Sequence, residues 1–222
     1  MGINIAIDGT AGSGKGSVSK QLAKRLGFFH LDTGAIYRSV AYAAIEQKIS
    51  PNDEKKLEKM LKNISFSVKL EKVGENQVQK NILNGEDLKE KIRTEEISEA
   101  SSIVSQFKEV REFATSIQHK IANKYDVIIE GRDIGTVILP NADFKFFLTA
   151  SPEVRARRRL EQLNLPESEF ENVLNEIKGR DRRDSLRAIS PLKVADDAIY
   201  IDNSNQTVDQ TVQLMVDYII GN

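Results

Sequence analysis

The chain has 222 residues, of which 40% are hydrophobic and 29% charged, and its formal net charge is −1. This composition is typical of one domain with a substantial core, and the near-zero net charge argues against a non-specific nucleic-acid binder. The sequence contains no cysteine, which excludes disulfides, thiol catalysis and cysteine-based zinc sites.

The first residues of the chain, 1–8, contain neither a basic region nor a long apolar run. We therefore expect neither a signal peptide nor a membrane span. The resulting expectation is a cytoplasmic monomer that binds neither membranes nor nucleic acids.

The first predicted elements are a strand and three helices. Ile3 to Ile7 form a short apolar run typical of a strand buried on both faces. The spacing of Val18, Leu22 and Leu26 predicts a helix that ends at Gly27. Further helices are predicted over residues 35–47 and 55–62.

Residues 64–92 show a different pattern. Phe66, Val68 and Leu70 alternate with polar residues, and turn residues follow at 74–76 and 84–85. Period two with these turns predicts a small antiparallel ribbon, which we interpret as a β-rich insertion over residues 64–92. Thr94 then predicts the cap of one long helix that continues to about Asn123.

The remaining sequence alternates again between strands and helices. Strands are predicted over 127–129, 144–148 and 198–201, arginine-rich helices within 152–187, and a last helix over 207–219. This alternation predicts an α/β fold with three layers around a mostly parallel sheet, in a single domain spanning residues 1–222.

A glycine-rich segment lies between the first strand and the first helix, which is the context that a phosphate-binding loop requires. Glycines allow successive N–H groups to surround phosphate oxygens, and the lysine adds a positive charge. A chance glycine-rich turn is the alternative, but the flanking elements disfavour it. The predicted ATP-binding residues are Gly9, Thr10, Ala11, Gly12, Ser13, Gly14, Lys15, Gly16 and Ser17.

One position departs from the common form of this motif. Position 16 is Gly instead of Ser or Thr, and the hydroxyl group comes one residue later, at Ser17. This arrangement resembles nucleoside-monophosphate kinases more than GTPases or motor ATPases. We expect Ser17 to lie near the Mg²⁺ that accompanies ATP, directly or through water.

Three further segments carry a closer resemblance: Leu31 to Arg38, Glu130 to Thr136 and Arg180 to Asp184. Together with the insertion, they closely resemble bacterial cytidylate kinases, from Ile5 to about Asp202. The resemblance implies a P-loop kinase that transfers the γ-phosphoryl group of ATP to CMP or dCMP, giving CDP or dCDP. It also implies that the insertion belongs to the acceptor-binding region.

The resemblance also implies roles for individual residues. Glu130 stands where some relatives have Asp, which leaves its contact with Mg²⁺ or water open. The residues implied to bind the acceptor are Thr33, Arg38 and Arg132 at its phosphate, Arg180 and Asp184 at its ribose, and Ser102, Arg111, Asp133 and Arg187 at its cytosine. A lid over ATP is implied at residues 151–166, and the catalytic set is Lys15, Arg38, Arg132, Arg155 and Arg159.

The residue types fit this chemistry independently. Phosphoryl transfer needs alignment and positive charge, and arginine binds phosphate with two parallel hydrogen bonds. Of 13 arginines, eight lie between residues 151 and 187. Helical spacing places Arg180, Asp184 and Arg187 on one face. A solvated face of salt bridges is the alternative reading for these arginines.

The base preference follows from hydrogen-bond polarity. Cytosine offers an amino donor at N4 and acceptors at N3 and O2, which would match the carboxylate of Asp133 and donors from Arg111 and Ser102. Uracil reverses this polarity, so we predict that CMP and dCMP exceed UMP by at least about tenfold in kcat/KM. The alternative reading of Asp133 is a structural salt bridge with Arg132.

Two other functions remain open at this point. One is a kinase of the same architecture with another acceptor, such as AMP, UMP or a small metabolite. The other is a nucleotide-binding switch without turnover, although Asn123 to Asp126 match a guanine-reading motif only in letters, since they precede a strand. His30 and His119 are isolated, and we interpret both as structural or exposed.

Overall fold

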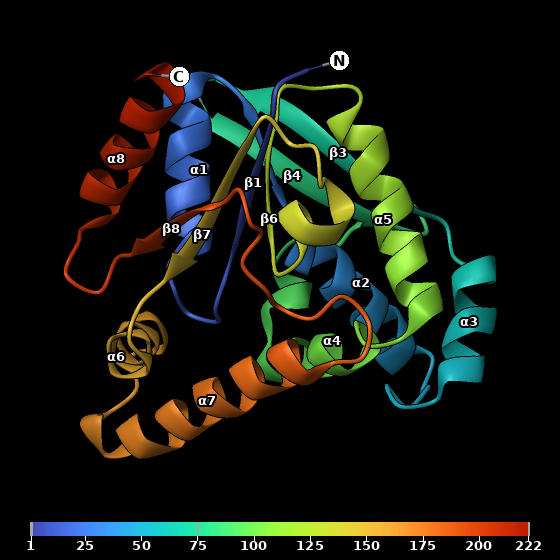
Figure 1. Ribbon diagram of the computed structural model, residues 1–222. Helices are drawn as coiled ribbons and strands as arrows, with labels where there is room; N and C mark the ends of the chain where they lie inside the picture. The colour runs from blue at the N-terminus through green and yellow to red at the C-terminus, as the bar shows by residue number, and fades with distance from the viewer. Residues whose placement is uncertain (1, 75, 222) are drawn as a thin grey trace. The chain divides into compact units, whose positions relative to one another are not determined.

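The computed structural model describes residues 2–74 and 76–221 (Figure 1). The chain forms two compact units. Unit 1 consists mainly of Phe29–Val127, and unit 2 combines Ile3–Phe28 with the chain from Ile128 onward. Across the described residues, none of the helices has the length and apolar character needed to cross a bilayer.

Unit 2 is built on a parallel sheet. Its strands are β1 (Asn4–Gly9), β6 (Val127–Gly131), β7 (Phe144–Thr149) and β8 (Ile199–Asp202), in the order β6-β1-β7-β8. β7 pairs in parallel with both β1 and β8. Each strand is a short apolar run, and the sheet is buried because helices cover it.

Two helices of unit 2, α1 (Lys15–Leu26) and α8 (Val208–Gly221), lie side by side (Figure 1). Val18 and Leu22 of α1 and Val212 of α8 are fully buried with the apolar side chains of the strands. α1 ends at Gly27, which adopts a left-handed conformation with φ of 73°. The predicted first strand, the helix stripe and its end are therefore confirmed.

The arginine-rich part of unit 2 forms α6 (Pro152–Leu163), a short 3₁₀ turn (Glu167–Glu169) and α7 (Phe170–Leu186). α6 starts at Ser151, whose hydroxyl accepts a hydrogen bond from the N–H of Val154 at 3.3 Å. A small apolar cluster joins the two helices, formed by Ala156, Leu160, Val173, Leu174 and Ile177. Unit 2 also contains a π-helical turn at Ile134–Ile138.

In the part of unit 1 that the structure describes, there are one short strand, four helices, a 3₁₀ turn and a small antiparallel sheet. The sheet consists of β3 (Phe66–Val73), β4 (Asn76–Leu83) and β5 (Glu86–Asp87), with Phe66 opposite Leu83. The other elements are β2 (Phe29–Asp32), α2 (Thr33–Glu46), α3 (Glu54–Asn63), the 3₁₀ turn (Lys89–Arg93), α4 (Glu95–Val104) and α5 (Lys108–Ala122).

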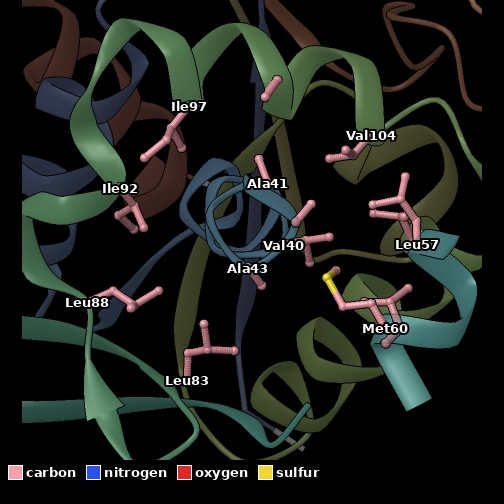
Figure 2. Packing of buried hydrophobic residues seen from close by; sticks show 14 of the residues in the cluster. Val40, Ala41, Ala43, Leu57, Met60, Leu83, Leu88, Ile92, Ile97 and Val104 are labelled. Carbon is pink, nitrogen blue, oxygen red and sulfur yellow. The ribbon is translucent and has the colours of Figure 1, made fainter. Parts of the chain in front are cut away.

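α2 is the centre of the unit 1 core. Figure 2 shows its apolar side chains surrounded by those of α3, α4, the 3₁₀ turn and the antiparallel sheet. Val40 and Ala41 of α2 are almost completely buried. The side chains around them include Leu57, Met60, Leu83, Leu88, Ile92, Ile97 and Val104.

The fold-class prediction is confirmed: a mostly parallel central sheet with helices accompanies a small antiparallel sheet. The predicted antiparallel ribbon corresponds to β3, β4 and β5. Of its predicted turn at 74–76, Glu75 lies outside the described residues. The sequence analysis did not predict β2, which has only four residues.

The prediction of one long helix from Thr94 to about Asn123 is wrong. Thr94 does cap a helix, since its hydroxyl accepts a hydrogen bond from the N–H of Ile97 at 3.3 Å. However, the chain breaks between α4 and α5, where Phe107 is extended. Side chains of Ser105 and Gln106 bind the Ser102 carbonyl at 3.1 and 3.2 Å, which competes with continuation of the helix.

The prediction that Arg187 shares a helical face with Arg180 and Asp184 is also wrong. α7 ends at Leu186, and Arg187 has an extended ψ of 141°. Its side chain therefore takes its direction from the loop that follows. Arg180 and Asp184 do lie on the helix, one turn apart.

Candidate active site

The glycine-rich loop of unit 2 connects β1 to α1. Gly9 is required at its start, because a Cβ there would lie 1.9 Å from the carbonyl oxygen of Leu148. The far side of the loop is held by Asn203, whose Nδ2 donates to the Ser13 carbonyl at 2.9 Å. Arg158 in turn donates to Asn203 Oδ1 at 3.0 Å and to its carbonyl at 2.9 Å.

Lys15 is buried at the base of the loop. Its Nζ donates to the carbonyl oxygens of Gly9 and Thr10 at 2.9 and 2.6 Å and to Ser13 Oγ at 3.3 Å. Burial, together with the positive charge of Arg132, lowers the pKa of Lys15 well below its usual range. A polyanion bound nearby would stabilise the protonated form of Lys15, because a negative charge favours a positively charged group.

Asp8, the residue before the loop, connects it to the segment after Arg132 and Asp133. Its Oδ1 accepts from the N–H of Ile134 at 2.8 Å, and its Oδ2 accepts from that of Gly135 at 2.7 Å. Asp8 is 4% exposed. Burial raises the pKa of its carboxyl to about 6, although the two N–H donors oppose this change.

Two ion pairs connect residues 132 and 133 to the last turn of α7 and to Arg187, which directly follows the helix. Arg132 Nε lies 2.8 Å from Asp184 Oδ2, and Arg187 lies 3.1 Å from Asp133 Oδ1. Burial alone would raise the pKa of Asp184, but the charges of Arg132 and Arg180 outweigh it, and the pKa lies below its ordinary value. Four of the predicted acceptor-binding residues thus form two adjoining pairs, beside Arg180.

The two arginines of α6 predicted to be catalytic differ in their surroundings. Arg155 is buried and donates to the Ala11 carbonyl at 2.7 Å. It also forms an ion pair of 2.6 Å with Asp181 of α7, whose other oxygen accepts from the N–H of Ala11. Arg159 is half-buried, and its hydrogen bond of 3.2 Å is to Gln162 on the same helix. Arg155 therefore supports the loop in this structure.

The two departures noted in the sequence, Gly16 and Glu130, lie next to each other. A Cβ on Gly16 would be 3.4 Å from Glu130 Oε1 and 3.9 Å from its Oε2. The carboxylate of Glu130 thus lies over the first turn of α1, where the common motif carries a hydroxyl group. Ser17 is exposed on the same turn.

In unit 1, the predicted residues Thr33 and Arg38 belong to α2. Asp32 caps this helix by accepting from the N–H of Ala35 at 3.1 Å, and its other oxygen lies 2.7 Å from Arg38. Burial would raise the pKa of Asp32, but Arg38 outweighs it and lowers the pKa below its usual value. A Cβ on Gly34 would lie 2.9 Å from the Arg38 guanidinium, so a side chain there would displace the guanidinium from its present position.

Ser102 and Arg111 lie on either side of the break between α4 and α5, and both are buried. Arg111 donates to the carbonyl of Ser105 at 3.2 Å, and its guanidinium lies 5.8 Å from the centre of the Tyr37 ring. Nine residues of continuous helix would separate the two positions by about 13 Å. The break lets Arg111 reach the end of α4.

The sequence analysis missed several residues that support these groups. Asp8 could have been suspected because it directly precedes the glycine loop, and Asp32 because it directly precedes α2. Asn203, Asp181 and Gln79, whose side-chain oxygen accepts from the N–H of Asp32 at 2.8 Å, carry no local signal, because their partners are distant in the sequence.

The fold and the loop define the class of protein. A parallel sheet, a glycine-rich loop at the start of a helix and a buried loop lysine are the features of a P-loop kinase. A solved shikimate kinase from Acinetobacter baumannii has a TM-score of 0.50 and 16% identity to this chain, covering 100% of this chain and 95% of its own. At this identity the likeness concerns the fold alone.

Sequence comparison identifies the family within this class. The family model for cytidylate kinase matches residues 5–220. The cytidylate kinase of Caldanaerobacter subterraneus is 46% identical, over 99% of this chain and 96% of that protein. The cytidylate kinase of Caldicellulosiruptor saccharolyticus is 44% identical, over 99% and 98% respectively. The chain belongs to the cytidylate kinase family.

Proposed function

We propose that this protein transfers the γ-phosphoryl group of ATP to CMP or dCMP. The observation that carries this proposal is the arrangement in unit 2: a glycine loop with a buried lysine is tied through Asp8 to the segment bearing Arg132 and Asp133. Donor-binding and acceptor-binding groups are thereby held by one buried carboxylate.

On the donor side, the loop supplies backbone N–H groups and the N-terminus of α1, both of which favour phosphate oxygens. Lys15 is already fixed by three hydrogen bonds within the loop. A charge fixed in advance stabilises the negative charge of the transferring group without reorganising during the reaction.

The residues near the loop fit a Mg²⁺ ion. Mg²⁺ prefers oxygen ligands and keeps several waters, and the exposed hydroxyl of Ser17 and the carboxylate of Glu130 are oxygen donors beside the first turn of α1. Bound with ATP, the ion would neutralise charge on the phosphate oxygens. Ser17 and Glu130 would hold it directly or through water.

On the acceptor side, we assign Arg38, Arg132 and Thr33 to the phosphate and Arg180 and Asp184 to the ribose. Ser102, Arg111, Asp133 and Arg187 are assigned to the cytosine. The ion pair of Asp133 with Arg187 supports this assignment, because it holds in place a carboxylate whose oxygens accept hydrogen bonds from an amino group.

We further assign the insertion at residues 64–92 to acceptor binding and residues 151–166 to a lid over ATP. Arg155 and Arg159 are the proposed catalytic arginines of the lid. In this structure Arg155 binds the loop carbonyl of Ala11, so its catalytic role would require the guanidinium to turn toward the phosphates when ATP binds. Closure of such a lid excludes water that would otherwise hydrolyse ATP.

An acceptor panel tests the proposal. ATP consumption is measured with CMP, dCMP, UMP and AMP under identical conditions. We expect CMP and dCMP to exceed UMP by at least about tenfold in kcat/KM, because uracil reverses the hydrogen-bond polarity and leaves buried polar groups unpaired. Equal rates with UMP would contradict the base assignment, and ATP consumption with none of the four would contradict the function.

A further inference from the structure

Gln79, on β4 of the insertion, binds the main chain at Asp32. Its Oε1 accepts from the N–H of Asp32 at 2.8 Å, and its Nε2 donates to the Asp32 carbonyl at 3.2 Å. The same Nε2 donates to Oδ1 of Asn81, a buried neighbour on the same face of β4, at 3.0 Å. Both ends of the amide are therefore used, and they hold the peptide groups on both sides of one residue.

The side chain of Asp32 links its main chain, which Gln79 holds, to Arg38. Its carboxylate caps α2 with one oxygen and holds the guanidinium of Arg38 with the other, at 2.7 Å. The guanidinium lies over Gly34, where a Cβ would be 2.9 Å from it. The direction of Arg38 thus depends on where the main chain of Asp32 is held.

The strand that carries Gln79 is itself anchored. Leu83, at the end of β4, is buried in the unit 1 core and points toward Ala43 of α2 (Figure 2). β4 also pairs with β3 along its whole length. The amide of Gln79 is therefore presented from a fixed strand.

We propose that Gln79 is a positioning residue for the acceptor: by fixing the Asp32 main chain, it holds Arg38 oriented for the acceptor phosphate. This inference rests on the proposed function, since it takes Arg38 as a phosphate ligand. It gives the insertion a specific task, which is to set the direction of an arginine that lies outside it.

The first test measures CMP binding by calorimetry without ATP. Gln79→Ala should weaken CMP binding by roughly five- to tenfold, as expected for the loss of one or two positioning hydrogen bonds. ATP binding, which does not involve Arg38, should stay within about twofold. In the full reaction the KM for CMP should rise while kcat changes little.

Gln213→Ala is the matched control. Gln213 lies on α8, outside the proposed binding residues, and both ends of its amide are likewise used: it accepts from Arg25 at 2.7 Å and donates to Asp217 at 2.7 Å. CMP binding by this variant should equal that of the wild type. Equal CMP affinity of Gln79→Ala and wild type would overturn the inference alone, whereas a wild type that binds ATP but no CMP would overturn the proposed function and the inference with it.

A double-mutant cycle tests whether Gln79 acts through Asp32. Asn caps helices as well as Asp does, so Asp32→Asn removes the charge that holds Arg38 and keeps the cap. In this background, Gln79→Ala should weaken CMP binding by less than about twofold, because the two changes are coupled. The same fold-change in both backgrounds would overturn the inference. If Gln79→Ala does not fold, Gln79→Glu is measured instead. It keeps the acceptor for the Asp32 N–H but loses the donor to the Asp32 carbonyl, and an unchanged CMP affinity would again overturn the inference.

Discussion

Lys15 carries an amino group into a buried position, where it binds carbonyl and hydroxyl oxygens of the loop. Such a position is unfavourable for folding, since burial lowers its pKa. A bound triphosphate would offset this cost. The residue is therefore placed for binding and catalysis more than for stability.

Replacement of Lys15 should distinguish a role in catalysis from a role in stability. We expect Lys15→Met to reduce kcat by a factor of about 10² to 10³, as for the loss of one preorganised charge at a transition state. The melting temperature should change little, because Met fills a similar volume without a buried charge. Lys20→Met, at an exposed position of the same helix, is the control, and near-normal turnover of Lys15→Met would contradict the assignment.

The raised pKa of Asp8 predicts that the free energy of unfolding depends on pH. Its pKa rises from an ordinary 3.8 to about 6 in the folded protein, so the folded state holds the proton more tightly than the unfolded chain. The associated stabilisation is complete below about pH 3.8 and is lost as the pH rises through about 6. A salt-bridged carboxylate has the opposite effect, because its stabilisation is lost as the pH falls.

The prediction is tested against Asp8→Asn, which cannot ionise. Between pH 5 and 7.5, the free energy of unfolding of the wild type should fall by about 1 kcal/mol relative to the variant. Urea unfolding at several pH values measures this difference. A difference that stays constant with pH would show that the buried carboxyl keeps an ordinary pKa.

At the scale of elements, α6 and α7 illustrate how arginines on one helix divide into buried and exposed positions. The apolar cluster between the helices fixes their packing, and the position of each arginine on α6 then decides its environment. The Arg155 side chain is 4% exposed in its pair with Asp181, whereas that of Arg157 is 59% exposed in its pair with Glu167. Helical periodicity places them on different faces.

These two pairs should differ in their effect on stability. Asp181→Ala leaves the buried guanidinium of Arg155 without its counter-charge and should lower the free energy of unfolding by roughly 2–4 kcal/mol. Glu167→Ala removes the same group from an exposed pair and should cost less than about 1 kcal/mol. Urea unfolding of both variants makes the comparison, and equal losses would contradict the burial argument.

At the scale of the whole molecule, ligands that bind only the folded protein should stabilise it. ATP with Mg²⁺ at about 100 times its Kd should raise the free energy of unfolding by about 2.7 kcal/mol, and CMP should do the same at about 100 times its own Kd. GTP at the ATP concentration should stabilise less. Thermal unfolding with each nucleotide measures this, and stronger stabilisation by GTP would favour the nucleotide-binding switch.

Much of the architecture followed from the sequence because it depends on neighbouring residues. The apolar run of β1, the stripe of Val18 and Leu22, the end at Gly27 and the cap at Thr94 involve residues only a few positions apart. The motif of the glycine loop belongs to the same kind, since its residues lie within nine positions of one another. The family followed from motifs that are also short.

Tertiary structure decided the features that depend on distant partners. Asp8 binds an N–H group 126 residues away, Gln79 one 47 residues away, and Asn203 a carbonyl 190 residues away. The break after α4 and the departure of Arg187 from α7 likewise replaced a helix that periodicity alone predicted. Local patterns state which conformation a segment prefers, but only the packed chain determines which buried polar group finds which partner, because each must be satisfied by whatever the fold brings beside it.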